Sequence, residues 1–305
     1  MSSLLTNSSA MVALQTLRAI NSNLNQANNR VSTGLRVNSA ADSAAYWAIA
    51  TTTKSDNGAL SAVNDALGLG SSTVNVMSTG LSQVNTALQK IKNLLVTAQE
   101  PGVDGKKIQT EITAQLNDIQ AKADASTLNG ENWLSVDSSA ANYNATKSIL
   151  ASFTRTATGV SVDTIDTDIS TISLYDANGN IGLVDKSRTS GGSTTSVANI
   201  DISALTDSAA DLTTIGEYMQ IVDDALADVT TASTTVGTVS TRIESQQTFV
   251  KALMDANTSA IGTLEDADIE SESARLKALQ TQQQLAIQSL SIANSSSQNV
   301  LQLFR

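Results

Sequence analysis

Apolar residues recur at alternating intervals of four and three positions in four segments of the chain, a spacing typical of helices that pack along one face. The most regular segment ends just before Pro101 and Gly102, a pair that stops a helix. Its apolar positions are Met77, Leu81, Val84, Leu88, Ile91, Leu95 and Ala98. A shorter helix is expected after the pair, with one face made of Ile108, Ile112, Leu116 and Ile119.

The same spacing returns in the last third of the chain and stays in one register for about 50 residues, which as a helix would extend roughly 75 Å. The apolar positions are Ile215, Met219, Val222, Leu226, Val229, Val236, Ile243, Val250, Met254, Ile261 and Leu264. Polar residues occupy the positions between them, namely Ser233, Ser240, Gln247 and Asn257. A helix this long exceeds the needs of a compact domain, and its polar seam positions lower stability but help to fix register.

The two chain ends show the same spacing, but fewer of the positions are occupied by large apolar residues. The N-terminal positions are Ala10, Leu14, Leu17, Asn21, Leu24, Asn28, Val31 and Leu35. The C-terminal positions are Leu276, Leu279, Gln283, Ala286, Leu290, Ala293, Ser297, Val300 and Phe304. Isolated helices of this kind are marginal in water, and their apolar stripes require partners. We therefore expect the two ends to lie side by side.

Between Asn129 and about Leu205 the pattern changes to short β-branched runs typical of strands. Strands are expected at 148–156, 160–165 and 169–175, followed by a hairpin turn at Asn178-Gly179 and a further strand at 181–184. The segment Ser190–Thr195 is expected to be a flexible loop. The predicted fold is mainly α, with long paired terminal and central helices in a hairpin or rod and a small β-rich central insert.

Composition narrows the function classes. The chain has no histidine and no cysteine, which excludes a Ser-His-Asp triad, a cysteine nucleophile and a zinc site built on these ligands. A net charge of −11 argues against a nucleic-acid partner. No apolar run approaches a membrane span, and no secretory signal is evident, so we expect a cytoplasmic protein or one that leaves the cell without a cleaved signal. We expect no catalytic residue, cofactor or metal.

Two clusters of side chains have competing interpretations. The acidic residues between Glu265 and Glu272 would suit a cation, but carboxylates at a helix N-terminus are the favoured interpretation because they complement the helix dipole. Tyr46 and Trp47 form an aromatic pair in a chain with only 3% aromatic residues. For this pair, packing in a core is expected rather than stacking on a ligand.

Both ends of the chain resemble the bacterial flagellins. The segment Arg30-Val31-Ser32-Thr33-Gly34-Leu35-Arg36-Val37-Asn38-Ser39-Ala40 is similar to the N-terminal signature of that family, and the similarity continues through 42–50. Glu265-Asp266-Ala267-Asp268 and the stretch 298–303 resemble the C-terminal signature. Departures include Tyr46-Trp47 in place of a common Gly-Leu and Ser297 in place of a frequent proline. The resemblance covers roughly residues 1–130 and 205–305.

The resemblance implies a secreted structural subunit that polymerises into the extracellular flagellar filament used for swimming. It implies three parts: an inner terminal helical pair (1–44 with 265–305), a middle helical rod (45–135 with 205–264) and an outer insert (136–204). It also implies passage through a type III export channel, and partners that include an export chaperone, cap and hook-junction proteins and other flagellin copies. Three alternatives remain: a hook–filament junction protein of the same export system, a coiled-coil signalling or scaffold protein and, least favoured, an enzyme built on carboxylates.

The resemblance also assigns roles to residues. Contacts for self-assembly are expected at Leu14, Leu17, Leu24, Val31, Leu35, Leu276, Leu279, Leu290, Val300, Leu301 and Phe304. The seam of the middle rod is expected at Met77, Leu81, Val84, Leu88, Ile91, Leu95, Val222, Leu226, Val229, Val236, Ile243 and Val250.

Three further residues align with segments that the vertebrate flagellin-sensing Toll-like receptor contacts in flagellins that activate it. They are Lys90, Leu94 and Glu111. Lys90 stands where activating flagellins carry arginine, so it keeps the charge but loses the planar fork of donors. An equally weighted interpretation is that Lys90 is simply a solvated charge on the helix surface.

Overall fold

The computed structural model describes residues 7–156, 158–179 and 181–303, and in the last helix it describes side chains as far as Ser295. The fold is mainly α with a small β-rich insert, which confirms the predicted fold class. The chain divides into two compact units, residues 1–58 with 254–305 and residues 59–253. Two long helices, α2 (Ala44–Ala98) and α4 (Ala209–Glu265), contribute residues to both units.

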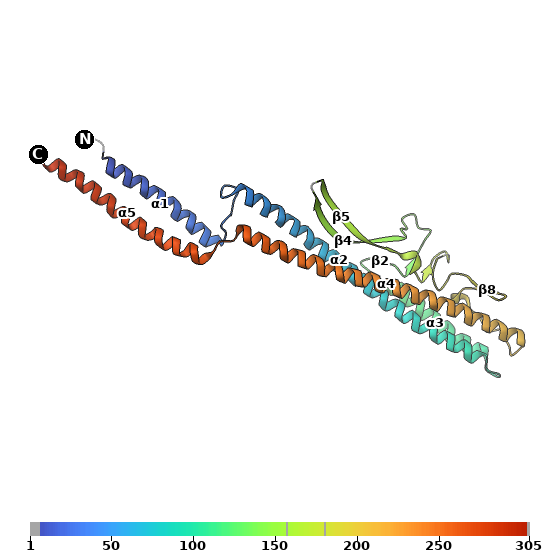
Figure 1. Cartoon of the computed structure of the whole chain (residues 1–305). Helices are drawn as coiled ribbons and strands as arrows, with labels where there is room; N and C mark the ends of the chain where they lie inside the picture. The colour runs from blue at the N-terminus through green and yellow to red at the C-terminus, as the bar shows by residue number, and fades with distance from the viewer. Residues whose placement is uncertain (1–6, 157, 180, 304–305) are drawn as a thin grey trace. The chain divides into compact units, whose positions relative to one another are not determined.

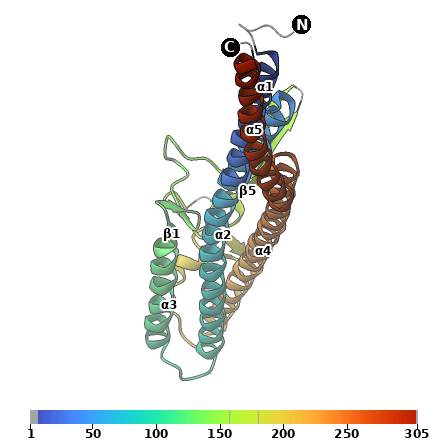
Figure 2. The same cartoon turned by 90° about the vertical axis from the view of Figure 1, so that its left-hand side faces the viewer.

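The first unit contains the two terminal helices, α1 (Ser8–Thr33) and α5 (Ile269–Leu303), which lie side by side and antiparallel (Figures 1 and 2). Polar contacts fix their register at one end and near the middle of the pair. The Asn7 side chain donates to the carbonyl of Ala293 at 3.0 Å, and the Gln283 side chain donates to that of Asn21 at 2.7 Å. The predicted pairing of the chain ends is therefore confirmed.

In the second unit, the seam of α2 begins well before the expected start at Met77. Buried positions continue the four-three spacing towards the N-terminus, at Leu60, Val63, Leu67, Gly70 and Val74. Gly70 interrupts the apolar pattern at a seam position because Ile149 of the insert lies against it, and a Cβ there would be 2.5 Å from Ile149 Cγ2. Because this buried seam position is a glycine and not a larger apolar residue, the apolar pattern in the sequence is interrupted although the helix continues.

Helices α3 (Gly105–Ala125) and α4 follow the expected pattern. The buried face of α3 consists of Ile112, Leu116, Ile119 and Ala123. Helix α4 lies antiparallel to α2 in this unit, where the Lys92 ammonium pairs with Asp223 at 2.6 Å and Asn85 donates to Thr230 at 3.3 Å. In the turned view α3 runs along α2 on the side away from α4 (Figure 2).

The insert is built from short antiparallel and parallel pairs rather than one sheet. Strands β4 (Thr146–Thr156) and β5 (Gly159–Asp168) form a hairpin close to the two strands predicted there (Figure 1). The smaller strands are β1 (Thr127–Leu128), β2 (Glu131–Asn132), β3 (Ser135–Val136), β6 (Tyr175–Asp176), β7 (Arg188–Ser190) and β8 (Ser193–Thr195). β1 pairs with β2, β3 with β6 and β7 with β8.

Three local predictions for the insert are wrong. The strand expected at 169–175 begins as a 3-10 turn (η1, Ile169–Thr171) because the Asp168 carboxylate accepts from the Ser170 amide at 3.0 Å and caps it. The segment 181–184 is not a strand. The expected flexible loop 190–195 is the β7–β8 turn, which is held in place because the Gly192 amide donates to Glu217 at 2.8 Å.

The insert has its own apolar core and is anchored to the helices of the same unit. Its fully buried side chains include Leu134, Ile169, Ile172, Leu174 and Val197. The Arg188 guanidinium, which is itself buried, pairs with Asp228 of α4 at 2.8 Å. A second 3-10 turn, η2 (Val197–Asn199), leads back towards α4.

Candidate assembly surfaces

The terminal pair buries little of its own apolar surface. Within α1, every residue of which is described, Ala27 alone is buried, and in the described part of α5 Leu279 alone is buried. The half-buried predicted contacts are Leu17, Leu24, Val31, Leu35, Leu276 and Leu290. Leu14 is 39% exposed. Alanine at the closest approach fills little volume, so two helices alone make a thin core.

The last residues of the chain carry further predicted contacts. Val300 and Leu301 lie in the final turns of α5, but their side chains are outside the described part, and Phe304 lies outside the described residues altogether. The backbone of α5 is helical as far as Leu303. Their role in assembly therefore stays a prediction.

Large apolar side chains point away from the pairing face of both terminal helices. On α1 these are Met11 and Val12, which are more than half exposed, and on α5 they are Leu285, Ile287 and Ile292. Exposed apolar side chains on both helices of a pair indicate a candidate interaction surface. The pair thus presents apolar surface outward as well as inward.

The loops that follow α1 and precede α5 meet in a backbone junction. The amides of Arg36 and Val37 donate to the carbonyl of Glu265 at 2.5 and 3.2 Å, and the Ala267 amide donates to the carbonyl of Gly34 at 2.9 Å. Gly34 adopts a φ of +71° as it ends α1, a conformation that favours glycine. The signature glycine is thereby explained by the turn that aligns the two loops.

An ion pair and a side-chain hydrogen bond also stabilise this junction. Glu265 is buried, with its side chain 4% exposed, and its carboxylate accepts from the Lys54 ammonium. Arg36 donates from its guanidinium to the carbonyl of Leu264 at 3.0 Å, which satisfies an acceptor at the C-terminal end of α4. The junction therefore ties the N-terminal signature to the C-terminal one, most directly through the bond from the Arg36 amide to the Glu265 carbonyl.

Two carboxylates in these loops accept several hydrogen bonds from nearby residues. A hydrogen bond from the Ser39 hydroxyl, with others from the amides of Asn38 and Ser39, lowers the pKa of Asp42. The pKa of Asp268 is lowered mainly by the Ser271 amide, in the first turn of α5. Asp268 therefore caps the N-terminus of α5, whereas Asp42 closes the turn that precedes α2. Within the described part of the chain no group of acidic residues is arranged to hold a metal ion.

The rod seam lies in the core of the second unit. All twelve predicted seam residues except Leu226 are buried, and Leu226 is half-buried beside the buried Ala225. Both helices also bury a second stripe, which the sequence pattern did not reveal. On α2 the stripe is Thr73, Gly80 and Ala87, and on α4 it is Ile221, Ala225, Ala232 and Val239.

The three residues aligned with receptor contacts come together on one surface. Lys90 and Leu94 of α2 and Glu111 of α3 line a shallow groove of about 430 Å³ between the two helices. Lys90 and Glu111 are exposed and Leu94 is half-buried. The structure thus brings together side chains from segments on either side of Pro101.

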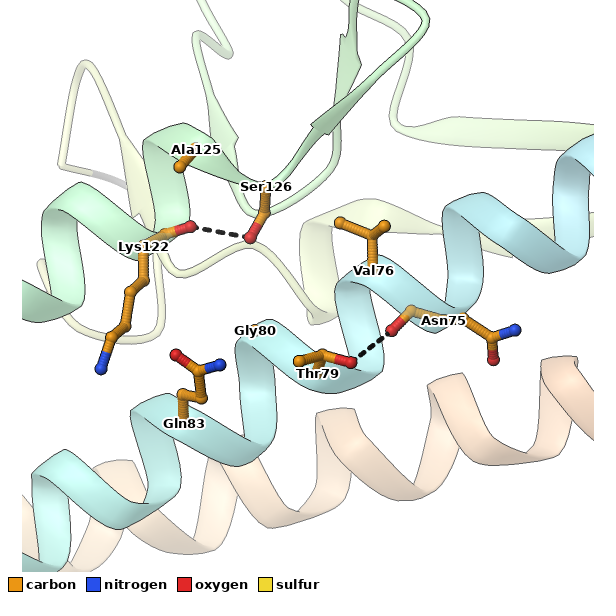
Figure 3. A pocket seen from close by; sticks show the side chains of 8 residues that line it. All are labelled: Asn75, Val76, Thr79, Gly80, Gln83, Lys122, Ala125 and Ser126. Carbon is orange, nitrogen blue, oxygen red and sulfur yellow. Dashed lines mark hydrogen bonds between the residues drawn. The ribbon is translucent and has the colours of Figure 1, made fainter.

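A second groove lies at the other end of α3, and five of the eight residues that line it have polar side chains (Figure 3). The Ser126 hydroxyl donates to the carbonyl of Lys122 at 2.7 Å, and the Thr79 hydroxyl donates to that of Asn75 at 2.9 Å. Gly80 sits between the helices, where a Cβ would lie 2.6 Å from Leu134 Cδ1. The same Cβ would lie 3.0 Å from Ser126 Oγ, so the absence of a side chain at Gly80 lets the end of α3 approach α2 closely.

Tyr46 and Trp47 do not pack in a core, so that prediction is wrong. In the first turns of α2 Tyr46 is 46% exposed and Trp47 is 38% exposed. The Arg36 guanidinium lies over the Tyr46 ring, 5.7 Å from its centre. Both side chains are exposed because the first turns of α2 are largely uncovered. Among the seven positions from Ala44 to Ala50, only Ala50 is buried.

The chain is similar to known proteins along its whole length. Residues 4–139 match the model of the bacterial flagellin N-terminal helical region, and residues 219–304 match that of the bacterial flagellin C-terminal helical region. The chain is 44% identical to Flagellin C of Rhizobium meliloti (strain 1021) and 40% identical to a flagellin of Brucella melitensis, with all of each chain covered. It is 38% identical to Flagellin A of Rhizobium meliloti (strain 1021), again over the whole of both chains. Among the described residues, no helix is long and apolar enough to cross a membrane.

Proposed function

This chain belongs to the bacterial flagellin family and is a structural subunit of the flagellar filament, not an enzyme, and on that basis we propose that the α1–α5 pair carries its principal self-assembly contacts. One observation carries the proposal. The pair buries only Ala27 and Leu279 among its described side chains, while both helices hold exposed apolar residues. Neighbouring subunits would cover those residues and supply the core that the pair lacks.

The proposed contacts are the apolar residues of the two chain ends. They are Leu14, Leu17, Leu24, Val31, Leu35, Leu276, Leu279, Leu290, Val300, Leu301 and Phe304. Leu14 supports the proposal because it is exposed in the single chain although it belongs to the apolar pattern. An apolar residue that recurs in register but finds no partner within the chain is available to a neighbour.

We place the terminal pair (1–44 with 265–305) at the filament core, the rod (45–135 with 205–264) outside it and the insert (136–204) outermost. The family matches support the outermost position of the insert. The family models leave 140–218 unmatched, and that range contains the β4–β5 hairpin and the β7–β8 pair. A segment outside the matched helical regions is expected at the surface, where loops vary most.

Export and delivery form the next part of the proposal. The subunit would leave the cell unfolded through a type III export channel, bound first by an export chaperone and added beneath a cap beyond the hook-junction proteins. The absence of cysteine and the single proline support passage of an unfolded chain, because neither disulfides nor slow proline isomers would hinder it. Thin terminal helices also favour a chaperone that covers apolar surface before assembly.

We further propose that the groove of Lys90, Leu94 and Glu111 contacts the vertebrate flagellin-sensing Toll-like receptor. The shared groove and the exposure of Lys90 and Glu111 support accessibility in the monomer. The lysine at the expected arginine position would make the contact weaker, because an ammonium cannot form the bidentate fork of a guanidinium.

The test of self-assembly is polymerisation of the purified full-length protein. Addition of a precipitating salt such as ammonium sulfate should yield long filaments, seen by negative-stain microscopy and recovered in the pellet after centrifugation. A hook–filament junction protein would stay monomeric under the same conditions, and nothing in the matches favours that alternative. A stable helical dimer without filaments would instead support a coiled-coil scaffold.

A further inference from the structure

The first turns of α2 carry the most concentrated exposed apolar surface near the junction. Tyr46 is 46% exposed, Trp47 is 38% exposed and Ile49 is 53% exposed. We call these three residues the aromatic patch. In contrast, the other tryptophan, Trp133, is 6% exposed in the insert. Aromatic side chains bury large areas and dominate interface energies, so their exposure in an aromatic-poor chain needs an explanation.

The first six residues of α2, which carry the patch, are not covered by other parts of their own unit. All six residues from Ala44 to Ile49 are exposed, and Ala50 is the first to be buried. A helix that is apolar on several faces is normally surrounded by protein. Tyr46 and Ile49 lie three residues apart and share one face of the helix, while Trp47 points to an adjacent side, so the patch spans more than one face.

The patch is also free of charge. The ten residues from Ala44 to Thr53 contain no charged side chain. The flanking charges already have partners, since Asp42 accepts from Ser39 at 3.0 Å and Lys54 pairs with Glu265. Each copy of the chain carries a net charge of −11, so copies repel one another across most of their surface. A neutral apolar patch is the surface where two such copies meet at the lowest electrostatic cost.

Arg36 prepares the patch for such a contact. Its guanidinium lies over the Tyr46 ring and also donates to the carbonyls at the end of α4. The ring is therefore held in place before any partner binds. Side chains that are fixed in advance lose less conformational entropy when an interface forms.

We propose that the aromatic patch is a contact surface for a neighbouring copy of this chain in the filament, separate from the α1–α5 assembly surface. The proposal rests on the filament function. Head-to-tail polymers pair two different surfaces, so the patch meets another part of the next subunit and not its own copy. In the filament, the Trp47 indole is covered by protein and shielded from solvent.

Fluorescence quenching of the full-length protein by acrylamide reads this burial directly. In the monomer the quencher reaches Trp47, while Trp133 is buried, and a Trp47→Phe variant identifies the accessible signal as that of Trp47. The accessible signal should fall several-fold when the wild-type protein is polymerised. Equal quenching of Trp47 in monomer and filament would mean that the patch faces solvent or some other protein, and would overturn the proposal.

The matching assembly experiment compares Trp47→Ala with two controls. Removal of an interface aromatic raises the critical concentration for polymerisation roughly tenfold, as for other interface anchors. Trp47→Phe keeps the ring and should assemble nearly normally. Val162→Ala removes an exposed apolar residue from the insert, outside the patch, and should leave the critical concentration unchanged.

Circular dichroism and proteolysis show whether Trp47→Ala is folded. The substitution removes an exposed side chain, so the monomer should keep its helical content. A critical concentration for Trp47→Ala equal to that of the wild type would contradict the proposal. If the wild-type protein itself formed no filaments, the proposed self-assembly would fail instead, so the two failures are distinguishable.

Discussion

The terminal pair and the rod carry the same four-three spacing of apolar residues, yet they bury it to very different extents. In the rod, Met77, Leu81, Leu88 and Ile91 have no exposed surface. In α1 the seam residues Leu17, Leu24 and Val31 are only half-buried. Periodicity therefore predicts which face of a helix makes contact, but it does not predict how many partners that face has.

The difference lies in a second layer of contacts. The α2 helix of the rod buries Gly80 and Ala87 in addition to its seam, because α3 and the insert pack on that side. On α4, Ile221 and Val239 belong to a similar second stripe. The terminal pair has no such layer among its described residues. We infer that neighbouring subunits provide it in the filament.

The largest effect is expected from removal of Val300–Arg305. If the terminal pair gains its core only between subunits, loss of these apolar residues should abolish polymerisation and leave the rod folded. Negative-stain microscopy and circular dichroism of the truncated protein provide the two readouts. Normal filaments from the shortened chain would show that the last residues carry no essential contact.

Two substitutions of the same type compare the regions quantitatively. Leu88→Ala removes a fully buried side chain from the rod and should lower the free energy of unfolding of the monomer by about 2 to 5 kcal/mol. Leu17→Ala acts on the thin terminal pair and should cost the monomer less than about 1 kcal/mol, because a half-buried side chain loses less contact.

Urea unfolding of both monomers, followed by circular dichroism, measures these costs. Leu17→Ala should nevertheless raise the critical concentration for filaments, whereas its effect on the rod transition stays small. Equal destabilisation of the monomer by both substitutions would mean that the terminal pair is as well packed as the rod.

The helical framework could be predicted from the sequence because each helix keeps one apolar register. Helix α4 has 57 residues, in keeping with the long register from Ile215 to Leu264. The apolar pattern alone placed the start of the α2 seam too late, at Met77, and Gly70 interrupts that pattern where Ile149 approaches. A pattern read along one helix does not contain the side chain that a distant segment places against it.

The insert shows a second limit of prediction from sequence, which concerns polar contacts with residues outside the segment. Ser190–Thr195 has the composition of a flexible loop, but Glu217, far along the chain, accepts from the Gly192 amide and the Ser193 hydroxyl and orders the turn. Tyr46 and Trp47 were expected in a core because aromatic residues usually are buried, and both are exposed. In both cases the deciding neighbour is distant in sequence or, as we propose for the patch, belongs to another subunit.

A smaller effect is expected at the exposed surface of the rod. Lys90→Arg should raise activation of the flagellin-sensing Toll-like receptor by roughly five- to a hundredfold, the range for one regained charged contact of about 1 to 3 kcal/mol. The stability of the monomer should not change, because Lys90 is exposed. Reporter cells treated with graded doses of monomer measure the effect, and full potency of the unmodified protein or no gain in the variant would argue for a simple surface charge.

Limited proteolysis of monomer and filament, performed side by side, tests the central claim most directly. The account predicts that the verified monomer loses about 40 residues from each end and leaves a resistant rod with its insert, because the thin terminal pair opens readily. In the filament the same cleavage sites should be protected, since neighbouring subunits complete the core. Protection of both termini in the monomer, equal to that in the filament, would contradict the account.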